Sequence, residues 1–204
     1  SSASTVIWNI RVPRVLCAML VGAGVSTSGA LYQGLLKNPM VSPDILGTTQ
    51  AAAFGSAFGI LMYFNFFEIT LLSFSLGVIS VFVTYNLSKI FRSDRILGLI
   101  LTGMMIGSLF SSLISFVKLV ADTENQLPSI TYWLMGSLAS VKMIDFKFMF
   151  FPIVIGLMVS NLYKIEINIF TMGEEEAKTL GLNTDKIRFI IIFFATLMTA
   201  SSVA

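Results

Sequence analysis

Residues 15–36 form a stretch of 22 positions without a single charged side chain. A bilayer core about 30 Å thick is crossed by about 20 apolar residues of helix, so this stretch is long enough to span a membrane. Its two ends differ in chemistry, because Arg11 and Arg14 precede it and the polar, proline-containing segment 37–44 follows it. The sequence therefore predicts a spanning helix with cations at one end and a polar turn at the other.

Five further stretches lack charge and are long enough, or nearly so, to span: residues 45–67, 69–88, 96–117, 148–163 and 189–204. The chain is 55% hydrophobic and 12% charged, whereas soluble domains carry about 25% charged residues. Residues 125–141 are also apolar, but they contain Pro128 and Gly136, which favours a half-helix near one membrane face. We therefore predict an all-α, polytopic membrane protein: a single transmembrane domain over residues 1–204 with six spanning helices.

The residues that are missing exclude several functions. The chain has no His, and its one cysteine, Cys17, lies inside an apolar stretch and cannot form an internal disulfide. It has no glycine-rich P-loop with Lys and Ser or Thr, so it is not predicted to hydrolyse ATP. A net charge of +2 is too small to indicate nucleic-acid binding. Without paired acids in a span or a metal-ligand cluster, we expect no enzyme activity, no cofactor and no metal.

The distribution of cations predicts the orientation of the chain. Helices that alternate in direction place eight Lys and Arg residues in one set of loops, including Lys37, Arg92 and Arg95, and five in the other set. The positive-inside rule puts the larger set in the cytoplasm. Arg11 and Arg14 then lie on the outer side, and the long polar loop at residues 173–183 lies on the cytoplasmic side.

Small residues recur at four-residue spacing inside the predicted spans, for example at Gly103, Gly107, Ser111 and Ser115. Such stripes let helices approach closely, and tight packing is the favoured interpretation. The alternative is a polar seam that lines a transport pathway. This stripe is the best candidate for such a seam, because its serines can bond to water, so Gly103, Gly107 and Ser111 are candidate pathway residues.

The polar loop at residues 173–183 has the pattern of a short helix. Glu174, Glu175 and Glu176 would begin it, where the helix dipole favours acidic side chains. Lys178 follows Glu174 at the i+4 position, and Gly181 would end the helix. A short cytoplasmic helix between two spans is suited to contact a soluble partner, and an ordinary solvated loop is the equal alternative.

Motifs occur along nearly the whole chain in a fixed order: Arg11-Val-Pro-Arg14, Asn38-Pro39-Met40, Pro43-Asp-Ile-Leu-Gly47, Tyr132-Trp-Leu-Met-Gly-Ser-Leu138 and Gly173-Glu-Glu-Glu-Ala-Lys-Thr-Leu-Gly181. Together they resemble the FecCD-type permease family, the membrane subunits of ABC importers for ferric siderophores, haem and cobalamin. The resemblance implies a ten-helix subunit of the bacterial cytoplasmic (inner) membrane, of which this chain would hold helices two to seven. The first helix and the last three would be missing.

The same resemblance implies partners and cargo. A second permease subunit, an ABC ATPase dimer on the cytoplasmic side and a substrate-binding protein on the outer side would join this chain in the lipid bilayer. Ferric siderophore, or a related iron chelate, is the cargo we expect. The alternative is a secondary transporter or channel for a small solute. That class usually places ionisable residues within spans, and the six charge-free stretches have none.

The resemblance also assigns roles to residues near the membrane faces. Arg11 and Arg14 would bind acidic side chains of the binding protein, since guanidinium pairs bidentately with carboxylate. Asn38 and Met40 would form a cytoplasmic gate. A second constriction would lie at Ile96 and Leu97. Asp44 is expected to be the N-cap of the helix that follows it.

Residues 174–181 would be the coupling helix, which sits in a cleft of the ATPase and moves as a rigid body with it. Ala177, Leu180 and Gly181 are the expected packing contacts. The three glutamates, Glu174, Glu175 and Glu176, are expected at the rim of that contact.

Overall fold

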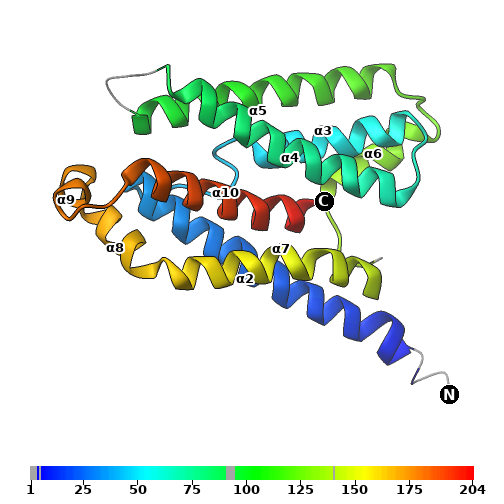
Figure 1. Cartoon of the computed structure of the whole chain (residues 1–204). Helices are drawn as coiled ribbons and strands as arrows, with labels where there is room; N and C mark the ends of the chain where they lie inside the picture. The colour runs from blue at the N-terminus through cyan, green and yellow to red at the C-terminus, as the bar shows by residue number, and fades with distance from the viewer. Residues whose placement is uncertain (1–3, 5, 91–94, 140) are drawn as a thin grey trace.

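The computed structural model describes residues 4, 6–90, 95–139 and 141–204, and every regular element in these ranges is helical. Arg92, one of the cations used to orient the chain, lies outside these ranges. The elements in chain order are η1 (Ile7–Arg11), α2 (Val12–Leu36), α3 (Thr48–Leu61), α4 (Phe66–Ser88), α5 (Arg95–Val120), α6 (Gln126–Met135), α7 (Met143–Leu162), α8 (Lys164–Met172), α9 (Glu174–Thr179) and α10 (Thr184–Val203). The predicted all-α fold is confirmed (Figure 1).

The first predicted span is longer than expected, because η1 and α2 join into one apolar stretch of 30 residues, Ile7–Leu36. Arg11 and Arg14 therefore lie within the helical segment rather than ahead of it. The helix α2 ends where Lys37 takes a left-handed conformation (φ 50°) and donates its backbone N–H to the carbonyl of Gln33. Pro39 follows within two residues and cannot continue a helix.

Five helical stretches in the described ranges are long and apolar enough to cross a membrane: Ile7–Leu36, Phe66–Ser88, Arg95–Val120, Met143–Leu162 and Thr184–Val203. The sixth predicted span, residues 45–67, is wrong as a single helix. Its place is taken by α3, which has only 14 residues, and by the start of α4. The turn into α4 is fixed by a capping box, in which the side chains of Asn65 and Glu68 each accept a hydrogen bond from the other residue's backbone N–H.

The chain nevertheless passes from one end of the bundle to the other between α2 and α4. The 14 residues of α3 cover part of that length, and the non-helical residues 38–47 cover the rest. Lys37 Nζ donates to the carbonyl of Met172 at the end that carries α8 and α9, whereas the carbonyl of Leu61 accepts from Gln126 Nε2 of α6 at the opposite end (Figure 1). Within this segment Leu46 is fully buried. Non-helical backbone is tolerated at membrane depth where protein covers it, and Leu46 and Gly47, at the inner end of this segment, are buried.

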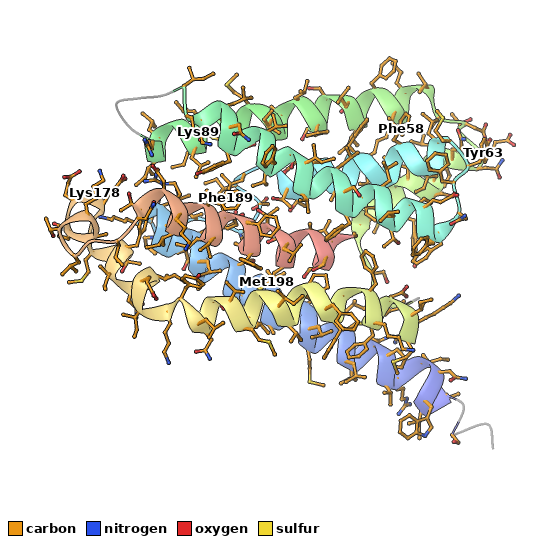
Figure 2. The ribbon with its side chains drawn as sticks, viewed as in Figure 1. Phe58, Tyr63, Lys89, Lys178, Phe189 and Met198 are labelled. Carbon is orange, nitrogen blue, oxygen red and sulfur yellow. The ribbon has the colours of Figure 1, made fainter. Side chains whose placement is uncertain are left out.

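Helix α10 lies at the centre of the fold, between the layer of α3, α4 and α5 and the pair α2 and α7 (Figure 1). In the most apolar 18-residue stretch of α10, 56% is buried inside the structure, whereas the corresponding value for α7 is 17%. Two buried hydroxyl pairs join it to α2, between Tyr32 and Thr196 (2.8 Å) and between Thr199 and Ser28 (3.1 Å). Met198, labelled in Figure 2, is fully buried in the same core. The core is thus built on α10.

The predicted half-helix is also present. Residues 125–141 contain the ten-residue helix α6, which ends at Gly136 with a φ of 71°. A glycine takes that left-handed conformation without steric cost. The carbonyl of Leu61 binds this helix to the end of α3 through Gln126.

Large apolar side chains stand exposed along α5, among them Met105 (68% exposed), Phe116 (61%) and Leu119 (81%). A contiguous apolar surface of this kind is unfavourable in water and marks contact with lipid or with another protein. The outer face of α5 is therefore suited to a bilayer or to a second subunit.

Candidate functional site

The short helix predicted in the polar loop is α9, which begins at Glu174 and ends before Gly181, whose φ is 78°. The sequence analysis assigned no element to residues 164–172, which form the preceding helix α8. Phe170 of α8 is 2% exposed and packs into the main hydrophobic cluster. The two short helices together form one end of the molecule (Figure 1).

A buried ion pair ties α9 to α10. Arg188 Nη2 donates to Glu174 Oε2 over 2.5 Å, and the Arg188 side chain is only 5% exposed. Its Nη1 donates to Asp185 Oδ1 over 3.2 Å, and its guanidinium lies 5.6 Å from the centre of the Phe170 ring. Thr184 Oγ1 adds a hydrogen bond of 3.4 Å to Glu174 Oε1. The position of α9 therefore depends on the first turn of α10.

The same pair sets the ionisation of Glu174. Partial burial opposes the charged carboxylate, but the charge and hydrogen bond of Arg188, with a smaller contribution from Lys178, outweigh that effect. The pKa of Glu174 consequently lies below its ordinary value of 4.5. Glu174 is thus held as a carboxylate at neutral pH.

Two of the residues expected to contact a partner, Glu174 and Ala177, face the interior of the chain instead. Ala177 is fully buried and Glu174 faces Arg188, so both belong to the interior of this chain. Glu175, with a side chain 86% exposed, and Leu180, 64% exposed, point outward, and Glu176 and Gly181 are also exposed. Lys178 and Thr179 are exposed as well. We call Glu175, Glu176, Leu180 and Gly181, the exposed residues among those expected to contact a partner, the outer face of α9.

The expected cytoplasmic gate lies beside this end of the fold. Asn38 Oδ1 accepts a 2.9 Å hydrogen bond from the backbone N–H of Met40, which closes the turn and leaves the Met40 side chain 88% exposed. At the start of α5, Ile96 packs against the main hydrophobic cluster, whereas Leu97 is 51% exposed. Met40 and Leu97 are thus the two expected gate residues that present an apolar surface outward.

Asp44 is not the N-cap that the sequence predicted. The N-cap of α3 is Gly47, with a φ of 82°. Asp44 lies three residues earlier, in the turn before the helix, where its carboxylate accepts from the hydroxyl of Ser42 and its carbonyl accepts from the N–H of Gly47. It stabilises the non-helical segment instead.

Gly103 and Gly107, two of the three candidate pathway residues, pack against that segment. Both are buried. A Cβ atom at Gly103 would meet the carbonyl oxygen of Ile45 at 2.5 Å, and one at Gly107 would meet Gly47 Cα at 3.6 Å. Close helix packing, the interpretation favoured from the sequence, accounts for both glycines. Ser111, one turn further along α5, is exposed.

The two arginines lie at the opposite end of the molecule from α9. Arg14 Nε and Nη2 donate to the carbonyls of Leu138 (3.1 Å) and Ala139 (2.8 Å), in the segment that follows α6. Arg11 is exposed in the last turn of η1. The two expected docking residues therefore differ in their contacts, since the guanidinium of Arg14 already binds backbone carbonyls of its own chain.

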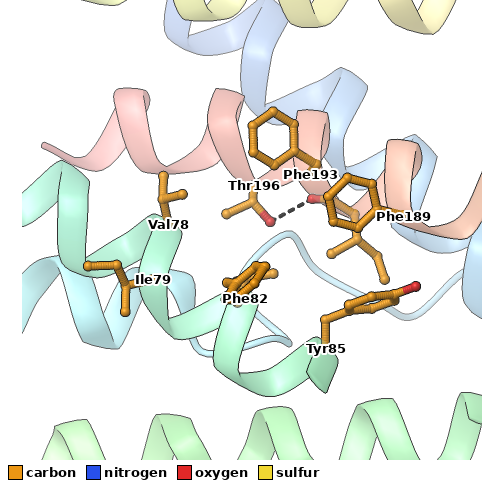
Figure 3. A pocket seen from close by; sticks show the side chains of 9 residues that line it. Val78, Ile79, Phe82, Tyr85, Phe189, Phe193 and Thr196 are labelled. Carbon is orange, nitrogen blue, oxygen red and sulfur yellow. Dashed lines mark hydrogen bonds between the residues drawn. The ribbon is translucent and has the colours of Figure 1, made fainter. Parts of the chain in front are cut away.

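An apolar groove of about 190 Å³ runs between α4 and α10. Figure 3 shows Phe82 and Tyr85 of α4 facing Phe189 and Phe193 of α10, and Thr196 donates its hydroxyl hydrogen to the backbone of its own helix. A groove with this lining suits hydrocarbon rather than a charged chelate.

The sequence analysis did not identify Arg188, Asp185 and Arg95 as interacting residues. Arg95 Nη1 donates to Asp185 Oδ1, which joins the start of α5 to the first turn of α10. These residues are 90 positions apart, so their contact depends on tertiary structure. The only sequence signal was that both arginines stand at the edge of an apolar stretch.

Comparisons with known proteins agree with this architecture. The chain matches the FecCD transport family over residues 1–204. The molybdate import system permease protein MolB of Haemophilus influenzae is 35% identical over 98% of this chain and 59% of its own length. The cobalamin import system permease protein BtuC of Halobacterium salinarum is 30% identical over 100% of this chain and 55% of its own length. The Fe(3+) dicitrate transport system permease protein FecD of Escherichia coli is 30% identical over 98% of this chain and 62% of its own length.

A solved structure of a metal-chelate type ABC transporter in an inward-facing conformation superposes with a TM-score of 0.93 at 35% identity, over 98% of this chain and 64% of that one. The chain spans about three fifths of the length of these curated relatives. Because the family match covers the whole sequence, the chain belongs to the FecCD transport family.

Proposed function

We propose that this chain is part of the permease subunit of a binding-protein-dependent ABC importer in the bacterial cytoplasmic membrane. The observation that carries the proposal is α9, a six-residue helix held at one end of a bundle of apolar spans, with Glu175 and Glu176 and the following residues Leu180 and Gly181 exposed. Residues 1–204 contain no P-loop, so an ABC importer built on this chain would hydrolyse ATP on a separate subunit, and such a helix offers that subunit a contact. Membership of the family supports the same conclusion.

The proposed partners match the exposed surfaces. An ABC ATPase dimer would bind the outer face of α9, and a substrate-binding protein would bind the opposite end, where Arg11 is exposed. A second permease subunit would cover exposed apolar side chains such as Met40 and Leu97, which would then form the cytoplasmic gate with Asn38. In the ten-helix subunit this segment would supply helices two to seven.

A ferric siderophore or related iron chelate remains the proposed cargo. Relatives are named for molybdate, cobalamin and ferric citrate, which makes a metal oxyanion or metal chelate the wider class. Titrating the purified partner binding protein with a ferric siderophore, cobalamin and molybdate, and following its fluorescence, identifies the cargo. Quenching by molybdate or cobalamin alone would refute the siderophore assignment.

The ATPase contact predicts the effect of charge reversal on the outer face of α9. The double substitution Glu175→Arg and Glu176→Arg is expected to weaken co-purification of the complete permease with its ATPase about tenfold, because repulsive charges at the rim of an interface slow association. Glu174 is left unchanged, since reversing it would break the ion pair with Arg188. Glu124→Arg, at an exposed residue of the opposite end, is the control. Undiminished co-purification of the double variant would contradict the assignment.

The docking contact predicts an effect of Arg11→Glu. Affinity of the substrate-binding protein for the complete permease is expected to fall at least about tenfold, because an arginine that faces carboxylates becomes a like charge. Surface plasmon resonance with the immobilised binding protein measures this change. Lys164→Glu, which reverses an exposed cation at the α8 end, should leave the affinity intact. A dissociation constant equal to that of the unsubstituted protein would place the docking site elsewhere.

A further inference from the structure

Four charged side chains form a continuous series of ion pairs from α9 to α5. Glu174 of α9 binds Arg188 of α10 at 2.5 Å, and Arg188 binds Asp185 at 3.2 Å. Asp185 in turn binds Arg95, the first residue of α5. Arg95 directly precedes Ile96 and Leu97, the expected second constriction. The series, which we call the ionic relay, thus begins on the proposed ATPase contact and ends at a proposed gate.

Arg188 is the most buried member of the relay. Its side chain is 5% exposed, whereas those of Glu174, Arg95 and Asp185 are 30%, 49% and 58% exposed. Arg188 also lies over the Phe170 ring of α8. A helix of six residues is too short to be stable on its own, so α9 depends on this anchor. The link from Asp185 to Arg95 is the more exposed one and is expected to be the weaker.

We propose that Arg188, Asp185 and Arg95 are positioning residues that transmit a movement of α9 to the start of α5. The inference rests on the proposed function, in which an ATPase moves α9. A rigid-body shift of a short helix is a common switching event, and energetic coupling between sites is carried by hydrogen-bond and ion-pair networks that join rigid elements. Because Arg188 binds both Glu174 and Asp185, α9 and the first turn of α10 move together, and Asp185 carries the shift to Arg95.

The test uses the complete permease with its ATPase, labelled with spin probes at Thr179→Cys of α9 and Ser108→Cys of α5, two exposed residues outside the relay. In the otherwise unsubstituted complex, the distance between the probes is expected to stay constant when ATP and vanadate are added, because α5 follows α9. In Arg95→Gln and in Asp185→Asn it is expected to change, by the 1–2 Å or so that helix shifts commonly involve. Arg95→Lys keeps the charge and should keep the distance constant.

A functional readout separates transmission from plain stability. With a ferric hydroxamate siderophore as probe, uptake per ATP hydrolysed in proteoliposomes should fall about two- to thirtyfold in Arg95→Gln and Asp185→Asn, the range typical of residues that modulate coupling. A loss of folding would lower uptake and hydrolysis together and leave their ratio unchanged. Lys186→Gln, which removes an exposed cation of the same turn that forms no ion pair within the described residues, is the matched control.

The outcomes distinguish the relay from the function on which it rests. Failure of the unsubstituted permease to co-purify with its ATPase would overturn the proposed function. An intact complex in which Arg95→Gln and Asp185→Asn retain both a constant probe distance and the original uptake ratio would overturn the relay alone. If Asp185→Asn does not fold, Arg95→Gln still decides, since it removes only the half-exposed outer link.

Discussion

Replacing Gly103 with alanine is expected to lower the stability of the protein by about 1–3 kcal/mol, the range found when groups are added to a packed core. The new Cβ atom would lie 2.5 Å from the carbonyl oxygen of Ile45 and 2.9 Å from Leu46 Cα. Both are backbone atoms of the non-helical segment at residues 38–47, so no side-chain rotation relieves the contact. The gain in helix propensity on replacing glycine, about 1 kcal/mol, offsets only part of this cost. Thermal unfolding of the purified protein in detergent measures the change.

Gly22→Ala is the matched control, because a Cβ atom at Gly22 would meet nothing within 4 Å. Gly22 lies within a spanning helix like Gly103, so the two substitutions make the same chemical change in the same kind of element. Gly22→Ala is expected to leave the melting temperature unchanged or to raise it. Equal effects of the two substitutions would show that Gly103 does not hold α5 against residues 45–46.

The long apolar elements could be predicted from the sequence because their signal is local. The charge-free stretches predicted the helices α2, α4, α5, α7 and α10. The pattern of three acidic residues followed by Gly181 predicted α9. In each case the residues that decide the structure lie within one helix length of each other. The half-helix α6 was predictable for the same reason, since Gly136 ends it.

The failures arise where contacts between distant residues decide the structure. Residues 45–67 were predicted to form one apolar span. In the structure residues 45 and 46 instead pack without helical structure against Gly103 of α5, and α3 begins only after its N-cap, Gly47. Glu174 was predicted to lie at the rim of a partner contact. In the structure it binds Arg188, which lies 14 residues later on another helix. Neither contact leaves a periodic pattern in the sequence.

Replacing Glu174 with leucine is expected to destabilise the α8–α10 end by about 1–3 kcal/mol, the range for leaving a buried hydrogen-bonding group without one of its partners. The substitution leaves the Arg188 guanidinium, 5% exposed, with Asp185 as its remaining carboxylate partner. Loss of the pair should also release α9, so that proteolysis in the loop around Gly181 becomes faster. Thermal unfolding and limited proteolysis of the purified protein measure the two effects. Glu175→Leu is the control, because the Glu175 side chain is 86% exposed and a surface ion pair contributes about 0–1 kcal/mol.

The same pair predicts the pH dependence of that end. The folded pKa of Glu174 is depressed below its ordinary value of 4.5, so the unfolded chain binds the proton more readily than the folded one. The contribution of the pair is therefore fully present above pH 4.5 and is lost as the pH falls through the folded pKa. Protection of α9 from hydrogen exchange should decline over that acidic range in the unsubstituted protein but not in Glu174→Leu, in which it is low throughout. An identical acid profile for the two proteins would show that the Glu174–Arg188 pair does not hold α9 in place.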